Sequence, residues 1–218
     1  LERFTGDIFR HRASGLVDFN RDRLFPMMYS NETPSLIKGD INQDGVDEVY
    51  VGGGKNQAGA FIDFRGNQIR SFTTGIFEEF RISEKTRSAF ADFDKDGDLD
   101  IYLSMGGRFF PKTSSALSDQ LLLNDGRGKF SKSPYPLPFS EFISTSVAKP
   151  IDFDNDGDPD LVVAERFDPF VYGTGGGAFL FENDGKGLFR DVTKEYAPVL
   201  SDIGMITDME IQDFDNDG

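Results

Sequence analysis

The segment DFDKDGDLD, residues 92–100, decides the fold because the chain repeats it with small changes. DINQDGVDE precedes it at residues 40–48, DFDNDGDPD follows at residues 152–160, and DFDNDG occupies residues 213–218. Each complete copy has oxygen-bearing side chains at positions one, three, five and nine and glycine at position six. This spacing is typical of a short loop that wraps a hard cation such as calcium. We therefore expect three complete calcium-binding loops and a truncated fourth.

Each copy predicts its own set of ligands. Alternate side chains of a tight loop point to the same side, and the glycine permits the positive φ that turns the backbone. Position seven offers its carbonyl oxygen and position nine closes the shell. Oxygen donors without Cys or His favour calcium over zinc. The predicted ligands are Asp40, Asn42, Asp44, Val46 and Glu48; Asp92, Asp94, Asp96, Asp98 and Asp100; Asp152, Asp154, Asp156, Asp158 and Asp160; and Asp213, Asp215 and Asp217.

Charge and composition fit a folded metal-binding protein. The 218 residues carry a net charge of −15, and apart from the assigned ligands the acids nearly balance the 23 Lys and Arg. Like charges in one loop repel, and a bound cation would relieve the repulsion. With 38% hydrophobic residues and 23 Phe the chain is not a solvated acidic tail. Its basic residues are scattered among acids, so we expect no nucleic-acid partner.

Composition also limits the chemistry and the compartment. Cysteine is absent, which excludes a disulfide framework and thiol chemistry. No apolar run reaches the length of a membrane span, and no segment has the pattern of a signal peptide. The chain starts at Leu1 and stops inside the fourth copy, so we expect it to be part of a longer protein. Calcium loops with Kd of about 10⁻⁴ to 10⁻³ M favour an extracellular setting.

The spacing of the copies predicts one β-propeller blade per repeat. They begin 52, 60 and 61 residues apart, which is near the period of a blade. Strand-like segments flank each loop, and helical periodicity is missing. These segments are PSLIKG (34–39) and EVYVGG (48–53), RSAFA (87–91) and DIYLSMGG (100–107), and SVAKPI (146–151) and DLVVAE (160–165).

A second repeat completes each blade. DQLLLNDGRGKF (119–130) and AFLFENDGKGLF (178–189) are typical of two strands joined by a glycine-rich turn, and AFIDFRGNQIRSF (60–72) is a weaker version. Each unit then holds four strands, with the calcium loop between the first and second. Position twelve, where an EF-hand needs a bidentate Glu, falls inside expected strands, so the pattern does not favour a helical calcium sensor.

These features predict an all-β chain of consecutive units. The expected divisions are a lead-in segment at 1–33, a blade at 34–86, a blade at 87–145, a blade at 146–204, and the start of another at 205–218. About three complete four-stranded blades are therefore present.

The motifs resemble the FG-GAP/VCBS repeats, whose blades are related to those of the integrin α-subunit propeller. The aspartate copies, the two NDGxG hairpins and the segments 18–54 and 197–218 are similar to large VCBS-repeat proteins exported by Bacteroidetes bacteria. The resemblance implies a propeller, seven-bladed when complete, that is secreted or lies on the outer-membrane surface of a bacterium. It implies a fold and metal sites but no reaction.

The long loops are the predicted partner face. Connections alternate between the two faces of a blade, so the calcium loops share one face and the long loops 106–118 and 165–177 share the other. Aromatic residues beside arginine could stack on sugars or anchor a protein. The alternative is that the Phe residues only cover blade edges. The candidate residues are Arg108, Phe109, Phe110, Arg166, Phe167, Phe170 and Tyr172.

Two classes of function follow. The first is a calcium-stabilised scaffold that binds a protein or glycan at the cell surface, including a partner in an outer-membrane complex. The second is a polysaccharide-acting, lyase-like propeller with structural calcium, which requires an unpaired Arg or Lys cluster in the central cleft. No such cluster is evident, and His11, the only histidine, has no nucleophile motif beside it. The sequence favours the scaffold and predicts no catalytic residue.

Overall fold

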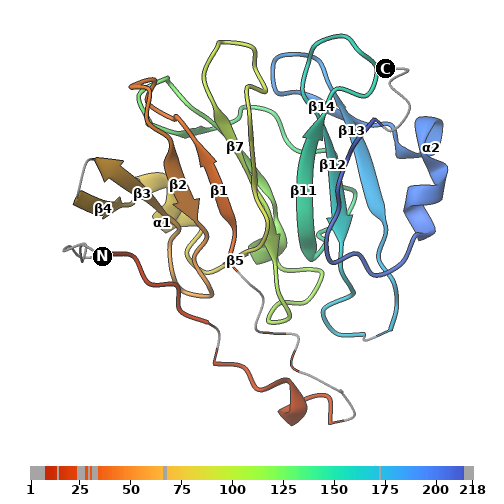
Figure 1. Ribbon diagram of the computed structural model, residues 1–218. Helices are drawn as coiled ribbons and strands as arrows, with labels where there is room; N and C mark the ends of the chain where they lie inside the picture. The colour runs from red at the N-terminus through yellow and green to blue at the C-terminus, as the bar shows by residue number, and fades with distance from the viewer. Residues whose placement is uncertain are drawn as a thin grey trace.

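Antiparallel β-sheets dominate the computed structural model, which describes residues 8–13, 15–23, 28, 30, 34–65, 68–171 and 173–213. Three sheets have four strands each and lie side by side, and a fourth sheet has two strands (Figure 1). In this part of the chain the helices are short, and none is long and apolar enough to cross a membrane. The prediction of an all-β chain is confirmed at this level.

The three large sheets repeat one plan, in which each strand pairs with the next along the chain. Sheet 1 contains β1 (Leu36–Gly39), β2 (Glu48–Val51), β3 (Ala60–Arg65) and β4 (Gln68–Phe72). Sheet 2 contains β6 (Ala89–Ala91), β7 (Asp100–Leu103), β9 (Gln120–Leu123) and β10 (Ser131–Lys132). Sheet 3 contains β11 (Thr145–Ile151), β12 (Asp160–Glu165), β13 (Ala178–Asn183) and β14 (Phe189–Asp191).

The remaining elements are small. Strands β5 (Glu84–Lys85) and β8 (Met105–Gly106) pair with each other and tie the chain after sheet 1 to sheet 2. The helices are η1 (Asp18–Asn20), α1 (Gly75–Glu79), η2 (Ser115–Leu117), α2 (Thr193–Tyr196) and η3 (Pro198–Asp202).

Strand register makes the three sheets directly comparable. Position ten of each aspartate copy pairs with the third strand, at Val49↔Ile62, Ile101↔Leu122 and Leu161↔Phe181. The residue two places further along the chain is therefore Phe64 in sheet 1, Asn124 in sheet 2 and Asn183 in sheet 3. This correspondence identifies which side chains occupy the same place in each sheet.

Apolar side chains fill the space between neighbouring sheets. Between sheets 1 and 2 the buried cluster includes Tyr50, Phe61, Ile101 and Leu122, and the Tyr50 and Phe61 rings lie 5.6 Å apart. A second cluster, with Phe93, Leu161 and Phe181 among its members, joins sheets 2 and 3. Because both faces of sheet 2 are covered, every residue of β7 is buried. This explains why its residues Ile101, Tyr102 and Leu103 form an unbroken hydrophobic run and do not alternate with polar residues.

The first strands of the sheets, β1, β6 and β11, lie next to one another. Arg87, two residues before β6, forms a parallel bridge with Val147 of β11. In the described residues the sheets form a row, with the amino-terminal segment crossing beneath them in Figure 1. A closed ring is not formed by this part of the chain.

Candidate functional site

The three complete aspartate copies form loops of one conformation at the same edge of the molecule. We call them loop 1 (40–48), loop 2 (92–100) and loop 3 (152–160); each joins the first strand of its sheet to the second. The position-six glycines have φ of 84°, 96° and 83°, as the sequence predicts. Position four also has positive φ, between 56° and 61° in all three loops.

The position-one aspartate organises each loop. In loop 2, Asp92 Oδ1 accepts from Asp96 N at 3.1 Å and Asp92 Oδ2 accepts from Gly97 N at 3.0 Å. Asp40 makes the same two contacts in loop 1, and Asp152 Oδ2 accepts from Gly157 N in loop 3 at 3.1 Å. Such local bonds from Asp to following backbone groups stabilise a turn. The backbone of the loop is thus wound around this carboxylate.

The winding brings several of the predicted ligands together. Oxygen atoms of Asp92, Asp94 and Asp100 lie within 4.8 Å of one another in loop 2. In loop 3 the corresponding group is Asp152, Asp154 and Asp156. Asp96 and Asp160 lie outside these two groups, although the sequence assigns them the same role.

Position nine is a structural connector as well as a candidate ligand. The buried carboxylate of Asp100 accepts from Phe93 N and Asn124 N, both at 2.9 Å. Burial, with smaller contributions from nearby carboxylates, raises the pKa of Asp100 to about 7. The side chain therefore joins the second residue of loop 2 to the β9–β10 turn.

Loop 3 repeats this connection. Asp160 Oδ1 accepts from Asn183 N at 2.8 Å, and Asp160 Oδ2 accepts from Phe153 N at 3.1 Å. Burial raises the pKa of Asp160 to about 6. The recurrence in two sheets indicates that the contact belongs to the repeat and not to one local environment.

The asparagine of each NDGxG turn links neighbouring loops. Asn124 Nδ2 donates to Ile41 O in loop 1 at 2.8 Å and to Leu99 O in loop 2 at 3.1 Å. This asparagine thereby satisfies one carbonyl in its own sheet and one in the preceding sheet.

Asn183 makes the equivalent pair of contacts one sheet later. Its Nδ2 donates to Phe93 O at 2.8 Å and to Pro159 O at 3.1 Å. Sequence reasoning assigned these motifs to turns and missed the inter-sheet role. The available signal was the asparagine itself, whose amide nitrogen stays free to reach a neighbouring sheet while its Oδ1 accepts from Gly128 N or Gly187 N inside the turn.

Position four adds a second link along the same edge. Gln43 Nε2 donates to Gly97 O at 3.1 Å, from loop 1 to loop 2. Lys95 Nζ pairs with Asp158, from loop 2 to loop 3. Through these side chains loop 1 contacts loop 2, and loop 2 contacts loop 3.

The donor chemistry of loops 2 and 3 is compatible with a hard cation. All the converging side-chain donors are carboxylate oxygens, without imidazole or thiolate. Asp98 Oδ1 is buried and has no hydrogen-bond partner in the described part of the chain. Burial and then the charges of Asp96 and Asp94 raise the pKa of Asp98 to about 6. A cation at this loop would offset that repulsion.

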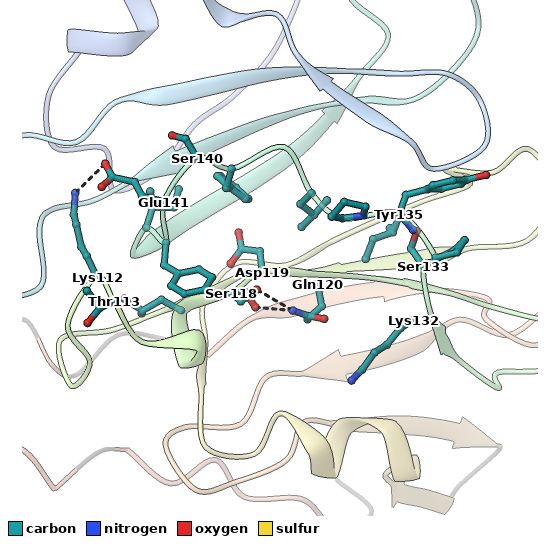
Figure 2. A pocket seen from close by; sticks show the side chains of 18 residues that line it. Lys112, Thr113, Ser118, Asp119, Gln120, Lys132, Ser133, Tyr135, Ser140 and Glu141 are labelled. Carbon is teal, nitrogen blue, oxygen red and sulfur yellow. Dashed lines mark hydrogen bonds and ion pairs between the residues drawn. The ribbon is translucent and has the colours of Figure 1, made fainter.

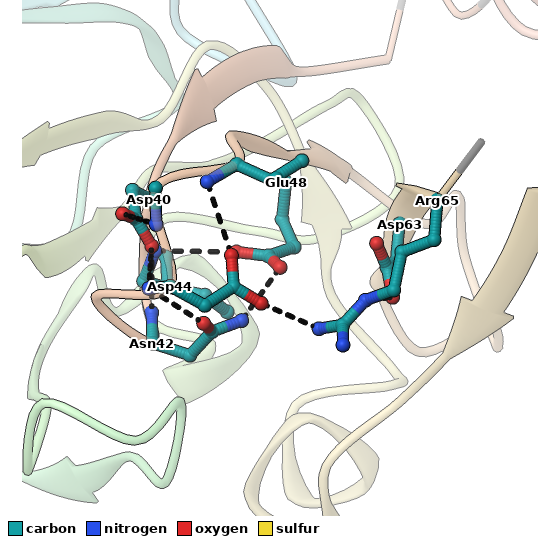
Figure 3. A network of polar contacts seen from close by, with 9 residues as sticks. Asp40, Asn42, Asp44, Glu48, Asp63 and Arg65 are labelled. Carbon is teal, nitrogen blue, oxygen red and sulfur yellow. Dashed lines mark hydrogen bonds and ion pairs between the residues drawn. The ribbon is translucent and has the colours of Figure 1, made fainter.

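Loop 1 has a different environment, shown in Figure 3. Arg65 Nη2 lies 2.6 Å from Asp44 Oδ2, and Arg65 Nε lies 2.7 Å from Asp63 Oδ2. Asn42 Nδ2 donates to Glu48 Oε1 at 2.6 Å. Two of the predicted ligands, Asp44 and Glu48, are thus already engaged by side-chain donors.

The fourth copy and part of the partner face lie outside the described residues. Of the truncated copy only Asp213 is described, and it is exposed. Asp215, Asp217 and Tyr172 are not among the residues that the structure describes. Their assignments stay predictions.

Two residues of the predicted partner face are buried, which corrects the expectation that they are accessible. Arg108 is 1% exposed and Phe167 is 2% exposed. The lead-in segment covers this region: Arg108 Nη2 donates to Asp22 at 2.7 Å, and Arg21 donates to the carbonyls of Arg108 and Pro169 at 2.9 and 2.8 Å. These contacts attach the amino-terminal segment to sheets 2 and 3.

The other described members of that face are more accessible. Phe170 is 48% exposed, and the centre of its ring lies 4.7 Å from the Arg21 guanidinium. Phe109 and Phe110 are half-buried, and Lys55 Nζ lies 3.9 Å from the centre of the Phe109 ring. Arg166 is also half-buried, against Phe167. Phe170 is therefore the most exposed candidate of the described set.

A cavity of about 790 Å³ lies between β9 of sheet 2 and the segment 133–143 (Figure 2). Its lining combines apolar groups such as Leu121 and Phe139 with Lys112 and Lys132. Lys112 Nζ lies 3.3 Å from Glu165 Oε1, and Lys132 Nζ lies 2.7 Å from Glu79 Oε2, so both cations have acidic partners. Sequence reasoning missed this cavity, whose signal was the proline-rich run SPYPLPF at 133–139.

A smaller cavity, of about 500 Å³, lies where β1, β6 and β11 meet. Three cations line it among the described residues, and each forms an ion pair. Lys38 pairs with Asp47 at 3.0 Å, Arg87 pairs with Asp208, and Lys149 pairs with Glu210 at 3.4 Å.

Comparison with known families gives one match. A family model described as an FG-GAP-like repeat matches residues 31–103 and 152–218, which contain loops 1, 2 and 3 and the truncated fourth copy. No curated protein matches the chain significantly.

Proposed function

Because the chain belongs to the FG-GAP-like repeat family, we propose that its sheets are blades of a calcium-stabilised β-propeller that serves as a scaffold for a protein or glycan partner. Three four-stranded sheets of one plan, each with an acidic loop between its first two strands, support this proposal. The complete ring would be seven-bladed, with its remaining blades contributed by further sequence. In such a ring the outer faces of sheets 1 and 3 would each pack against a further blade.

The observation that carries calcium binding is the repeated network of loops 2 and 3. In both, the position-one carboxylate closes the loop while the position-nine carboxylate is held by the NDGxG asparagine. Carboxylates of one loop are thereby held close together at a cost in repulsion, which a divalent cation would remove. The glycines at position six and the purely oxygen donor sets of the described loops favour calcium among common metals.

An extracellular location follows from the same proposal. Loops of this kind bind calcium weakly, with Kd of about 10⁻⁴ to 10⁻³ M, and fill only where calcium is abundant. The resemblance to exported VCBS-repeat proteins supports the outer-membrane surface or the exterior of a bacterium. The partner would contact the face opposite the calcium loops, where Phe170 is exposed beside Arg21. Aromatic and arginine side chains are frequent anchors in binding surfaces.

The lyase-like alternative has no specific observation in its favour. It needs unpaired cations in the central cleft to receive acidic sugar. Among the described residues, the cations around the cavity between β1, β6 and β11 are all paired with acids. We therefore keep the non-catalytic scaffold as the conclusion.

Thermal unfolding with calcium and with chelator tests the proposal. Ligand that binds only the folded state stabilises it by about 2.7 kcal/mol per site at 100 times Kd, so the midpoint should rise clearly with calcium. Equal ionic strength supplied by sodium chloride should give a smaller rise, because it only screens the acids. Magnesium should also be less effective, since it dehydrates reluctantly. A midpoint that responds equally to sodium and calcium would contradict specific binding.

A further inference from the structure

In loop 1 a guanidinium lies on the position-five carboxylate, whereas loops 2 and 3 have no such arginine contact among the described residues. We propose that the Arg65 guanidinium takes the place of the cation in loop 1, so that this loop closes without calcium and binds it more weakly than loops 2 and 3. The inference rests on the proposed calcium binding by those two loops. Arg65 would then set the difference in calcium affinity between loop 1 and loops 2 and 3.

The first line of evidence is the geometry of Arg65. It is the last residue of β3, and its guanidinium contacts two carboxylates at once: Asp44 at 2.6 Å and Asp63 at 2.7 Å (Figure 3). Asp44 is position five of the loop. A guanidinium that uses two of its nitrogens in this way is held in orientation and forms strong charge-assisted hydrogen bonds. The positive charge is therefore fixed at the loop.

The second line is the correspondence between sheets. Counting from the paired residues Ile62, Leu122 and Phe181, Arg65 occupies the place of Asp125 in sheet 2 and Asp184 in sheet 3. This place at the start of the hairpin turn thus holds a cation in sheet 1 and an acid in the other two. Only in sheet 1 is its charge opposite to that of the loop.

The third line is the use of the ligand atoms. Asn42 at position three donates its Nδ2 to Glu48 Oε1 at 2.6 Å and accepts from Asp44 N through Oδ1 at 3.1 Å. Ile41 N donates to the other Glu48 oxygen at 3.2 Å. Both oxygens of Glu48 are therefore occupied by donors of loop 1 itself. The backbone donor recurs at position nine of loops 2 and 3, where Phe93 N and Phe153 N donate to Asp100 and Asp160, so the contact that distinguishes loop 1 is the donation from the Asn42 side chain. Calcium at loop 1 would have to displace Asn42 Nδ2 from Glu48 and compete with Arg65 for Asp44.

The test uses variants in which loop 1 is the only complete loop. In the double variant Asp94→Asn, Asp154→Asn, calcium titration by calorimetry should show no site, or only one weak site, with Arg65 present. Adding Arg65→Met should create one site or tighten the residual one about tenfold or more, because a charge-assisted competitor is removed. Arg70→Met is the matched control: Arg70 is exposed on β4 of the same hairpin and donates to Gln68 at 3.1 Å. Arg70→Met should leave the calcium affinity of loop 1 unchanged.

Thermal unfolding in chelator gives a second readout in the otherwise unchanged chain. Arg65→Met should lower the midpoint more than Arg70→Met, and calcium should restore most of the difference. Arg65→Lys keeps the positive charge but cannot contact Asp44 and Asp63 through two nitrogens of one planar group. The calcium affinity of loop 1 in this variant should therefore lie between those of the unchanged chain and Arg65→Met. This variant also covers the case in which Arg65→Met does not fold.

The outcomes separate this inference from the proposed function. If the unchanged chain binds no calcium at all, the proposed function fails and the inference fails with it. If loops 2 and 3 bind calcium but the affinity of loop 1 is altered by neither Arg65→Lys nor Arg65→Met, only the role of Arg65 is overturned. A third site that appears only after Arg65→Met supports both.

Discussion

Loop 1 has the same backbone conformation as loops 2 and 3, but its acidic side chains are neutralised in a different way. All three have positive φ at positions four and six and a position-one aspartate that accepts backbone hydrogen bonds. In loops 2 and 3 an asparagine from the hairpin turn holds the position-nine aspartate, whereas in sheet 1 the hairpin supplies Arg65. Glycine and position one therefore set the shape of the loop. The neighbouring hairpin sets how its acids are neutralised.

The largest expected effect is the loss of a turn asparagine. Asn124→Ala and Asn183→Ala should each lower the free energy of unfolding by about 2–3 kcal/mol, because buried carbonyls in two sheets lose their donor. Phe64→Ala, at the equivalent place in sheet 1, should cost less than about 1 kcal/mol because Phe64 is exposed. Urea unfolding at saturating calcium measures all three. Equal losses would show that the asparagines are ordinary turn residues.

The next effect concerns calcium stoichiometry. Asp94→Ala should remove one strong site and the stabilisation that it gives, about 2.7 kcal/mol at 100 times Kd. Asp44→Ala, at position five of loop 1, should leave the number of strong sites unchanged because Arg65 already engages that carboxylate. Calorimetric titration counts the sites. Loss of a strong site in Asp44→Ala would make loop 1 equivalent to the others.

The pH dependence should distinguish the loops in chelator. The pKa is raised to about 7 for Asp100 and to about 6 for Asp160, mainly by burial, so the folded chain holds protons that the unfolded chain releases near pH 4. Stability should therefore fall by about 1.4 kcal/mol per group and pH unit as pH rises from about 4, where the unfolded carboxyls ionise, to the folded pKa values of about 6 and 7. Saturating calcium should reverse the trend, since ions bind the ionised carboxylates.

Two variants sharpen that measurement. Asp100→Asn should flatten the decline, because the amide resembles the protonated acid and does not titrate. Glu48→Gln should flatten the fall in stability less than Asp100→Asn does. Burial also raises the pKa of Glu48, but the hydrogen bond from Asn42 stabilises its ionised form. Chemical unfolding at several pH values supplies the comparison. An unaltered slope in Asp100→Asn would place the titrating group elsewhere.

The smallest effects belong to the links at position four. Lys95→Ala and Gln43→Ala should each cost less than about 1 kcal/mol, because both side chains are exposed. Salt should weaken the Lys95–Asp158 contact and leave the Gln43 contact nearly unchanged, since only the first is an ion pair. Unfolding at low and high sodium chloride separates them.

Sequence reasoning succeeded where the signal was local. Strands on both sides of each loop, the hairpins around Gly126 and Gly185, and the positive φ of the loop glycines were all predicted. These features depend on residues close together in the chain, whose backbone preferences are known. The position-twelve residues also lie in strands, as expected.

It failed where partners are distant in sequence. Arg108 was expected on an exposed face, yet its partner Asp22 lies 86 residues earlier. The carbonyls bound by Asn124 Nδ2 include Ile41, 83 residues earlier, and those bound by Asn183 include Phe93, 90 residues earlier. No local pattern specifies such contacts. They depend on how sheets stack, which the apolar residues determine only collectively.

The asparagine contacts give the row of sheets a direction. Each contact runs from a donor in the later sheet to a carbonyl of the earlier one, at both described junctions. The two sides of a junction are therefore chemically unlike, and the interface is heterologous. A sheet of this type can accept a successor only on one side, so assembly proceeds head to tail. Two identical copies could not pair through these surfaces by a twofold axis.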